Sequence, residues 1–439
     1  MAIGGSGAPR VHDVLVIGAG QGGLAVSFFL TGSGIEHVVL ERSRIGSSWR
    51  EHRWDSFCTV TPNWSMRLPG AEYAGDDPDG FLARDDLVGH FEAWARSFDA
   101  PVRCGVEARA VRPAGGGFEV ATSEGPFRAR NVVVATSTYQ HPHVPAVAAR
   151  LPSRLEQLTP HDYKHPGMLP PGAVMVVGSG QTGCQIAEEL HAAGREVFLC
   201  VGRAGRLPRR WRGRDCIEWQ RDMGYLDRTP DMLESPAARF RGDPHLTGRN
   251  GGYTLSLHDF HRRGIRLLGR LVHCDDERAR FDGGLHAEMR YADEFCDRIV
   301  EQFERHIADQ AIDAPAPTPA ELAGGPPEDG RLPDIVREVD LAAERVGTVV
   351  WATGYRYDFS WVEAPVLDPS GYPEAPGGVS ACPGLCFVGL NWMTWRKSGI
   401  LYGVGDDARS VAEHLVGRLS HRSRRRAAAP EAAMAAGSK

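Results

Sequence analysis

The sequence lacks the features that mark membrane, nucleic-acid-binding and secreted disulfide-rich proteins. No apolar run approaches the roughly 18 residues that a membrane-spanning helix needs, and segment 1–10 holds no apolar signal core. Positive charge is not in excess, because 50 Lys and Arg stand against 56 Asp and Glu, a net charge of -6. That balance gives no sign of a nucleic-acid or membrane-surface partner. We therefore expect a cytoplasmic protein that binds neither nucleic acid nor a membrane.

The sequence also lacks paired cysteines and metal-ligand spacings. Its 9 cysteines include no C-x-x-C pair, and the nearest two are Cys382 and Cys386. An odd number of scattered thiols, several of them in apolar runs, is typical of buried cysteines in a reducing compartment. Two histidine pairs lack a third ligand nearby: His141 with His143, and His258 with His261. The sequence thus predicts neither a disulfide framework nor a metal site.

What the sequence does contain is an internal repeat. Segments 14–41 and 174–201 align without a gap, each with a short apolar run, G-x-G-x-x-G, a helix-patterned stretch and a second apolar run. That order predicts strand, tight turn, helix and strand. A chain of 439 residues is also long enough for two joined domains. We expect an α/β protein with two three-layer, Rossmann-like dinucleotide-binding domains.

Each glycine of the repeated motif has its own expected role. The first permits the tight turn, the second lets the backbone approach a pyrophosphate, and the third allows the helix to pack closely on the strand. The helix N-terminus then offers unpaired N–H groups and the positive end of its dipole to the phosphates. These roles assign to cofactor binding Gly18, Gly20 and Gly23 in the first copy, and Gly178, Ser179, Gly180, Gln181, Thr182 and Gly183 in the second.

The two copies differ where their ligands should differ. The first copy ends in Glu41, whose carboxylate can accept hydrogen bonds from ribose hydroxyls and would repel a 2′-phosphate, which suits FAD or NAD; we include the adjoining Arg42. The second copy has Val201 at the equivalent position. Arginines follow it, and they suit the 2′-phosphate of NADPH, although an exposed basic loop is the alternative. We favour Arg203 over the three that come later, Arg206, Arg209 and Arg210.

Two further apolar strands end in Ala-Thr. They are NVVVAT, which ends at Thr136, and TVVWATGY at 348–355, which contains Thr353 and Gly354. Small residues at the end of a buried strand leave free backbone where a nucleotide meets the sheet edge. We therefore add Thr136, Thr353 and Gly354 to the cofactor-binding candidates.

The ordered set GAGQGG, IGSSW (45–49), GSGQTG and ATGY (352–355) resembles the flavin-containing monooxygenases. It also resembles their bacterial branch, often labelled as putative flavoproteins involved in potassium transport. The resemblance covers residues 11–215 and 333–417. It implies an NADPH domain inserted in an FAD domain, flavin reduction by NADPH, and transfer of one oxygen atom from a C4a-hydroperoxyflavin to an amine or sulfur substrate. It also implies that Trp49 lies near the flavin, and that residues Leu401 to Asp406 aim a helix N-terminus at its ring.

The resemblance also sets the expected domain boundaries. These are 1–155 for the first part of the FAD domain, 156–332 for the NADPH domain with a helical insertion, and 333–417 for the second part of the FAD domain. The arginine cluster at 422–426 and the Ala-rich end that follows it predict a disordered tail over 418–439. Within the insertion, apolar residues recur every four positions between His286 and Gln310, which predicts one long helix. That helix is expected to cover the active site or to form a homodimer contact.

The expected chemistry requires no metal and no protein nucleophile. A neutral donor near the flavin would stabilise the peroxide, and Asn63 is our candidate for this catalytic role, with a turn-forming role after Pro62 as the alternative. The stretch LTPHDYKHPG keeps the family's Tyr163 but has Thr159 and Pro160 in place of its His-Ser pair. A small-molecule substrate and O2 are the expected partners.

Three alternatives use the same pair of nucleotide folds. A disulfide reductase requires a redox-active cysteine pair, and the sequence has none at the right spacing. An N-hydroxylating or Baeyer–Villiger enzyme would differ only in substrate and peroxide protonation. A reductase or oxidase without oxygen transfer, or a redox-sensing flavoprotein, is the remaining alternative.

Overall fold

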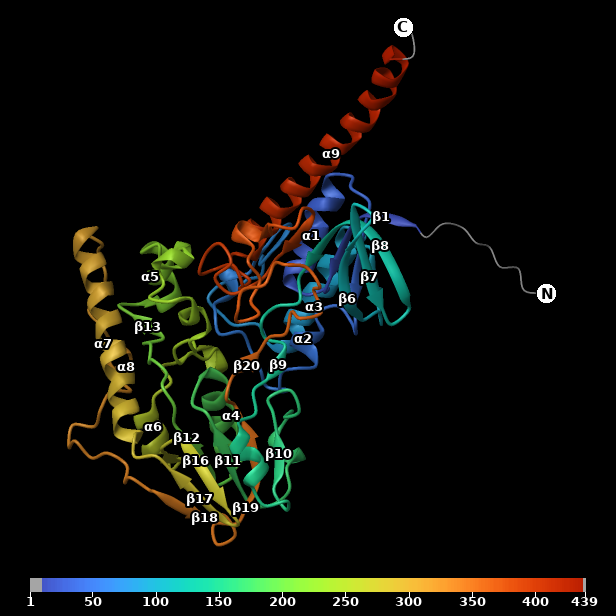
Figure 1. The fold of residues 1–439 in the computed structure, drawn as a ribbon. Coiled ribbons are helices and arrows are strands. Elements are labelled where there is room, and N and C mark those ends of the chain that lie inside the picture. Colours follow the sequence, from blue (N-terminus) through green and yellow to red (C-terminus); the bar gives the residue numbers. More distant parts are fainter. Residues whose placement is uncertain (1–9, 437–439) are drawn as a thin grey trace.

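The computed structural model describes residues 10–436, with side chains as far as His421. Figure 1 shows two lobes joined by a narrow waist, with α9 projecting from the upper lobe and α7 along the side of the lower one. Each lobe is built on its own sheet, which is mixed in the first lobe and fully parallel in the second. The mixed α/β architecture confirms the predicted fold class of two dinucleotide-binding domains.

The first lobe contains a seven-stranded sheet in the order β5-β2-β1-β8-β7-β6, with β21 also paired to β8. Strands β5, β2, β1, β8 and β21 are parallel, and β6, β7 and β8 form an antiparallel meander. The strands are β1 (Val11–Ile17), β2 (His37–Glu41), β5 (Val102–Cys104), β6 (Ala108–Ala114), β7 (Gly117–Thr122), β8 (Gly125–Val134) and β21 (Leu385–Phe387). Helices α1 (Gln21–Gly32), α3 (Arg84–Ser97) and α9 (Val404–Ala436) cover one face.

The second lobe contains a five-stranded parallel sheet in the order β10-β19-β11-β12-β15. Its strands are β10 (Glu156–Leu158), β11 (Ala173–Val177), β12 (Val197–Cys200), β15 (Arg266–Leu268) and β19 (Val346–Trp351). Helices α4 (Gln181–Ala192) and α6 (Leu257–Arg262) pack on one face. A meander of β16 (Leu271–Asp275), β17 (Arg278–Phe281) and β18 (Glu338–Asp340) covers the other.

The alternation of side chains along the central strands explains the three layers. In β1, Val14 and Val16 pack under the helices, whereas Leu15 and Ile17 pack against the opposite layer. The four residues of β11 that are 160 positions later divide in the same way. Because successive residues of a strand face opposite sides, an uninterrupted apolar run is what a sheet covered on both faces requires.

The helical insertion forms a satellite core beside the second sheet. Its long helix α7 (Leu285–Asp309) agrees with the helix predicted from the four-residue period, and its Phe303 and Ile307 are buried. These side chains pack around Trp219 of α5 (Cys216–Asp222), close to the short hairpin β13 (Arg210–Trp211) and β14 (Arg214–Asp215). The insertion therefore has a small apolar core of its own.

The chain crosses between the lobes twice, through two strands that pair with each other. It leaves the first lobe through β9 (His141–Pro142) and returns through β20 (Tyr355–Arg356), and these two strands are antiparallel partners in the waist of Figure 1. Because β18 and β19 belong to the layers of the second lobe, the return falls after Arg356 and not at residue 333. The NADPH domain is inserted as expected, but its end lies later in the chain.

The C-terminal segment also differs from the sequence prediction. A disordered tail is predicted for 418–439, but α9 continues through most of it and ends at Ala436. Ala and Arg, which dominate this segment, are strong helix formers, and they extend a helix that has already begun at Val404. Besides several 3-10 turns, the described chain has the short elements α2 (Ser47–Arg50), β3 (Arg67–Leu68), β4 (Ala71–Glu72) and α8 (Pro319–Leu322).

Candidate functional site

The first glycine turn lies between β1 and α1 and has one open position. Gly18 has a left-handed φ of +105°, and a Cβ there would lie 2.7 Å from the carbonyl oxygen of Ala135. A Cβ on Gly23 would overlap the carbonyl oxygen of Gly18. A Cβ on Gly20, in contrast, would meet no atom within 4 Å. Two glycines are therefore required by packing, and the middle one faces free space where a pyrophosphate could approach the backbone.

The second turn repeats this geometry between β11 and α4. Gly178 has a φ of +108°, and a Cβ there would overlap the carbonyl oxygen of Ala352. A Cβ on Gly183 would overlap the carbonyl oxygen of Gly178, whereas Gly180 again has no atom within 4 Å of a Cβ. The residues that close the two turns, Ala135 and Ala352, are the alanines of the two predicted Ala-Thr strand ends. Both turns thus have the shape that a dinucleotide requires.

Both helices that follow these turns present free N-termini. Neither α1 nor α4 has a side-chain N-cap or an acidic residue in its first turn, so the positive end of each dipole is available to an anion. The side chain of the first residue of each helix bonds to another segment and does not cap the helix. The side-chain amide of Gln21 donates to the carbonyl of Gly399, and that of Gln181 donates to the carbonyl of Pro244, both at 2.9 Å. Thr182 follows, half-buried, in the first turn of α4.

Glu41 is fixed at the end of β2 beside the first turn. It is buried, and its two carboxylate oxygens accept backbone N–H groups from Ala19 and Ser43, each at 2.9 Å. A carboxylate oxygen has more than one lone pair, so each can still accept a hydroxyl group. The carboxylate of Glu41 therefore lies beside the first turn with acceptor capacity to spare, and Arg42 is exposed next to it.

The arginines after β12 divide into exposed and buried groups. Arg203 is exposed, with a side-chain exposure of 60%; its Nε donates to Glu288 at 3.0 Å and its guanidinium lies over the ring of Tyr291. Arg270 binds the other oxygen of Glu288 at 2.6 Å, so two guanidinium groups lie at the end of the sheet. Sequence reasoning missed Arg270, although it closely follows the neighbouring apolar strand in RLLGR.

The other three arginines of this loop have structural partners. Arg206 pairs with Asp293 at 3.0 Å, and Arg209 forms a two-pronged pair with Asp215; both arginines are buried. Arg210 donates to two backbone carbonyls of the loop 251–252. Because buried ion pairs leave a guanidinium little capacity for a further ligand, Arg203 remains the phosphate candidate of the original four.

Ser179 joins the second turn to the end of β12. Its hydroxyl donates to the carbonyl of Gly202 and accepts the N–H of the same residue. The carbonyl of Ser179 accepts a hydrogen bond from Nε2 of His245 at 2.6 Å, and burial lowers the pKa of this histidine to about 4, so its ring is neutral. His245, in the loop before residue 249, therefore holds the second glycine turn in place.

The residues after the two Ala-Thr strands meet at the waist. Thr136 is half-buried, with the Gln140 amide at 3.4 Å from its hydroxyl. The Thr353 hydroxyl donates to the carbonyl of His143, whose own N–H donates to the carbonyl of Gly354 at 2.8 Å. Thr353 and Gly354 thus lie beside the second turn and also hold the domain crossing.

The approach to α9 carries a charged contact between the lobes. Leu401 is buried, and Asp406, in the first turn of α9, is exposed and pairs with Lys397 at 2.8 Å. Lys397 also pairs with Asp227 of the insertion at 2.8 Å. The predicted helix N-terminus is present, and it begins next to a lysine that joins both domains.

The side chain of Asn63 makes structural hydrogen bonds, whereas the predicted catalytic role requires it to donate toward the flavin. It is buried, its side-chain N–H donates to the carbonyl of Asp77 at 2.9 Å, and its side-chain oxygen accepts the N–H of Leu82 at 2.8 Å. These bonds fix the loop 77–82, and one amide N–H is left for another acceptor. The contacts agree with the turn-organising alternative, and the catalytic role stays a prediction.

Segment 49–57 lies at the junction of the domains. Trp49 is half-buried; its indole packs against the ring of Phe57, and the guanidinium of Arg53 lies over it. The Ser56 hydroxyl donates to Glu189 of α4 at 2.6 Å, and the hydroxyl of Tyr163 donates to the other oxygen of Glu189 at 2.7 Å. The sequence singles out Tyr163 but gives no reason to select Glu189, whose partners lie on other elements.

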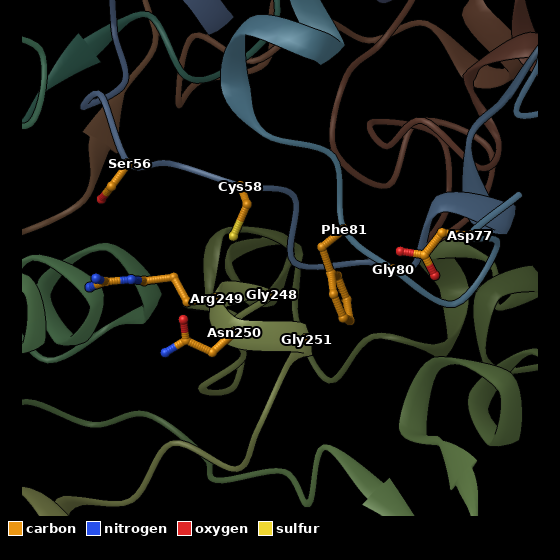
Figure 2. A pocket seen from close by; sticks show the side chains of 9 residues that line it. All are labelled: Ser56, Cys58, Asp77, Gly80, Phe81, Gly248, Arg249, Asn250 and Gly251. Atoms are coloured by element: carbon orange, nitrogen blue, oxygen red, sulfur yellow. The ribbon is translucent and has the colours of Figure 1, made fainter. Parts of the chain in front are cut away.

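A cavity of about 360 Å³ lies at the same junction (Figure 2). It is bordered by the segments 56–58 and 77–81 of the first domain and the loop 248–251 of the second.

Among the residues that the structure describes, no group of three or more His, Cys, Asp or Glu could hold a metal ion. Over the same described residues, no helix is long and apolar enough to cross a membrane.

The two domains and the paired glycine turns, with Glu41 beside the first of them, are the architecture of flavoproteins of the flavin-containing monooxygenase-like class. The family described as "Pyridine nucleotide-disulphide oxidoreductase" matches residues 15–210. An "Uncharacterized oxidoreductase CzcO-like" from Geobacillus kaustophilus is 30% identical over 410 residues, which cover 93% of this chain and 99% of the relative. The chain belongs to this family of CzcO-like oxidoreductases.

Monooxygenases are among its relatives and structural neighbours. "Indole-3-pyruvate monooxygenase YUCCA1" from Oryza sativa is 29% identical over 195 residues, 44% of this chain and 48% of that one. A flavin-containing monooxygenase from Stenotrophomonas maltophilia superimposes with a TM-score of 0.61 at 19% identity, covering 93% of this chain and 98% of that one. The bacillithiol disulfide reductase of Staphylococcus aureus shares the fold, with a TM-score of 0.58 at 11% identity. The chain is an oxidoreductase of the flavin-dependent monooxygenase type.

Proposed function

We propose that this enzyme consumes NADPH and dioxygen to transfer one oxygen atom to a small substrate with a nucleophilic amine or sulfur. The observation that carries the proposal is the duplicated turn. At Gly20 and Gly180 the backbone faces free space, whereas the glycines around them are closed by packing. Two such turns in one chain provide two dinucleotide sites, one for the electron donor and one for the flavin.

The first turn is proposed to hold FAD. Glu41 would accept the ribose hydroxyls, and the N-terminus of α1 would face the pyrophosphate. The start of α9, near Leu401 and Asp406, would lie toward the flavin ring, because Gln21 at the start of α1 already binds Gly399 in the segment that leads to it. When bound, FAD supplies the chemistry: it accepts a hydride from NADPH and activates dioxygen.

The second turn is proposed to hold NADPH. The N-terminus of α4 and the turn 178–183 would receive the pyrophosphate, and Arg203, assisted by Arg270, would bind the 2′-phosphate. Glu288 pairs with both guanidinium groups, and both arginine side chains stay more than half exposed. This arrangement favours NADPH over NADH.

The state of the cysteines favours oxygen transfer over disulfide reduction. Throughout the described chain every cysteine is free. Cys58 lines the junction cavity, but burial raises the pKa of its thiol, and burial also raises the pKa of Cys184 in α4. A disulfide reductase needs a low-pKa thiolate beside the flavin, usually with a second cysteine. A cytoplasmic location and a homodimer contact through α7 stay predictions.

The test is a coupling measurement on the purified FAD-loaded protein. NADPH oxidation is followed with and without (methylthio)acetate or an aromatic amine, while the oxygenated product and hydrogen peroxide are quantified. We expect oxygenated product to account for most of the NADPH consumed with at least one class of nucleophile. NADPH consumption recovered as hydrogen peroxide with every substrate would instead support the oxidase or redox-sensing alternative.

A further inference from the structure

The loop 248–251 presents an arginine to the junction cavity without a partner for its charge. Arg249 lines the cavity, and its Nη1 atom is buried and has no hydrogen-bond partner. Within the described chain, Arg249 also has no carboxylate at ion-pair distance. A buried guanidinium N–H that binds nothing is costly, so its position calls for a ligand.

The nearby carboxylates that could neutralise Arg249 already have other partners. Glu189 accepts the hydroxyls of Ser56 and Tyr163. Glu188 accepts the hydroxyl of Tyr253 and pairs with Arg263 at 2.7 Å. The charge of Arg249 acts on Cys58, Tyr163 and Tyr253, lowering the pKa of each against the stronger effect of burial. The thiol and hydroxyl groups that feel the charge of Arg249 do not neutralise it, and the described carboxylates around them are paired with other groups.

The loop that carries Arg249 is held in place from both sides. A Cβ on Gly248 would overlap the carbonyl oxygen of Thr59, and it would lie 2.6 Å from the ring of Phe81. A Cβ on Gly252 would lie 2.7 Å from the same ring. Between them Asn250 adopts a left-handed conformation, with φ of 50°. The backbone thus packs too closely on the first domain to carry Arg249 away from the cavity.

The opposite end of the cavity does not offer Arg249 a partner. Figure 2 shows Asp77 on the far side of Phe81 from the guanidinium, and no ion pair joins Asp77 to Arg249. The lining contains one cation, Arg249, one anion, Asp77, one aromatic ring and short uncharged polar side chains. One guanidinium group matches a singly charged carboxylate, whereas a phosphate dianion is usually met by several donors or a helix N-terminus.

We infer that the cavity binds a small carboxylate, and that Arg249 is the residue that recognises its charge. If the proposed function holds, the nucleophilic substrate of this enzyme carries a carboxylate group. The carboxylate would pair with Arg249 at the junction of the two domains, and the ring of Phe81 would contact the apolar part. Arg249 is then a specificity-determining residue contributed by the inserted domain.

The experiment uses a charge-matched pair of probes on the FAD-loaded protein. Calorimetric titration compares (methylthio)acetate with (methylthio)acetamide, which has nearly the same shape and no charge. We expect the acid to bind about tenfold more tightly or better, as for one charge-assisted hydrogen bond. Equal binding of the acid and the amide by the unaltered protein would overturn the inference without any variant.

Three variants then assign the effect. Arg249→Gln should reduce acid binding to the level of the amide, and Arg249→Lys should retain part of the preference because it keeps the charge. Arg241→Gln is the matched control, since Arg241 is an exposed arginine of the same domain paired with Glu234. An unchanged acid preference in Arg249→Gln overturns the inference. So does a variant that loses NADPH affinity instead, because Arg249 would then belong to the nucleotide site.

The binding experiment can fail or succeed independently of the oxygen-transfer test of the proposed function. Charge-selective binding that depends on Arg249, in an enzyme that transfers no oxygen to any probe, would refute the oxygenase proposal and leave the carboxylate site. Oxygen transfer to amines and thioethers without any preference for a carboxylate would do the reverse.

Discussion

Replacing Gly180 by Ala separates the binding role of the second glycine turn from its structural role. Gly180 precedes α4 with φ of -69° and ψ of -176°, a conformation that alanine adopts without strain. A Cβ at this position meets no atom of the protein within 4 Å. The substitution should therefore leave the fold intact, at a cost below about 1 kcal/mol for the weaker helix N-cap.

The effect on NADPH should be much larger than the effect on stability. The added methyl group would stand in the free space next to the N-terminus of α4, where the pyrophosphate is proposed to contact backbone N–H groups. The loss of one charge-assisted hydrogen bond costs about 1.5–3 kcal/mol, which corresponds to roughly a 10- to 100-fold rise in the Kd for NADPH.

Gly183→Ala is the matched comparison. Its Cβ would overlap the carbonyl oxygen of Gly178, a backbone atom that cannot rotate away, so we expect about 3 kcal/mol of destabilisation or more. The assay combines urea unfolding with NADPH titration under anaerobic conditions for both variants. A Gly180→Ala protein with unchanged NADPH affinity would refute the assignment of this turn to the nucleotide, and a stable Gly183→Ala protein would refute the packing argument.

Three further predictions concern the neighbours of the two turns. Glu41→Gln should weaken FAD binding at least about tenfold, measured by reconstitution of the apoprotein, because a carboxylate that accepts two backbone N–H groups and the ribose hydroxyls is replaced by a single carbonyl acceptor. Arg203→Gln should raise the KM for NADPH about tenfold and leave the KM for NADH unchanged; equal changes for both would contradict a 2′-phosphate contact. His245 has its pKa lowered to about 4 by burial, so the unfolded chain binds more protons than the folded one between that value and the ordinary histidine value of 6.5. The unfolding free energy should therefore fall by about 2 kcal/mol from about pH 7 to about pH 5 through this group, and His245→Gln should flatten that part of the profile in urea titrations.

Sequence patterns predicted the parts of the site that are formed locally. The glycine turns follow from residues within one strand–turn–helix unit, and Glu41 follows from its distance to that unit. The period-four apolar face likewise predicted α7 closely. Each of these features depends on neighbours in the chain, so a single sequence contains the necessary information.

The parts that depend on distant partners were not predictable in the same way. The strand VGTVVW could have joined either sheet, and only its pairing with β11 and β10 places it in the second. Arg206 resembled a phosphate ligand, but its partner Asp293 lies 87 residues further along the chain. The bonds of Asn63 and the pairing of Arg270 with Glu288 likewise join separate loops and helices. A residue type predicts a capacity to bind, and tertiary contacts decide whether that capacity is already used.

The origin of the oxygen atom in the product tests the central claim most directly. The FAD-loaded enzyme is supplied with NADPH, (methylthio)acetate and isotopically labelled dioxygen in unlabelled water, and the sulfoxide is analysed by mass spectrometry. The account predicts one labelled oxygen atom in each product molecule and an equal amount of NADPH consumed. Unlabelled product, or label found in hydrogen peroxide alone with every amine and thioether supplied, would contradict it.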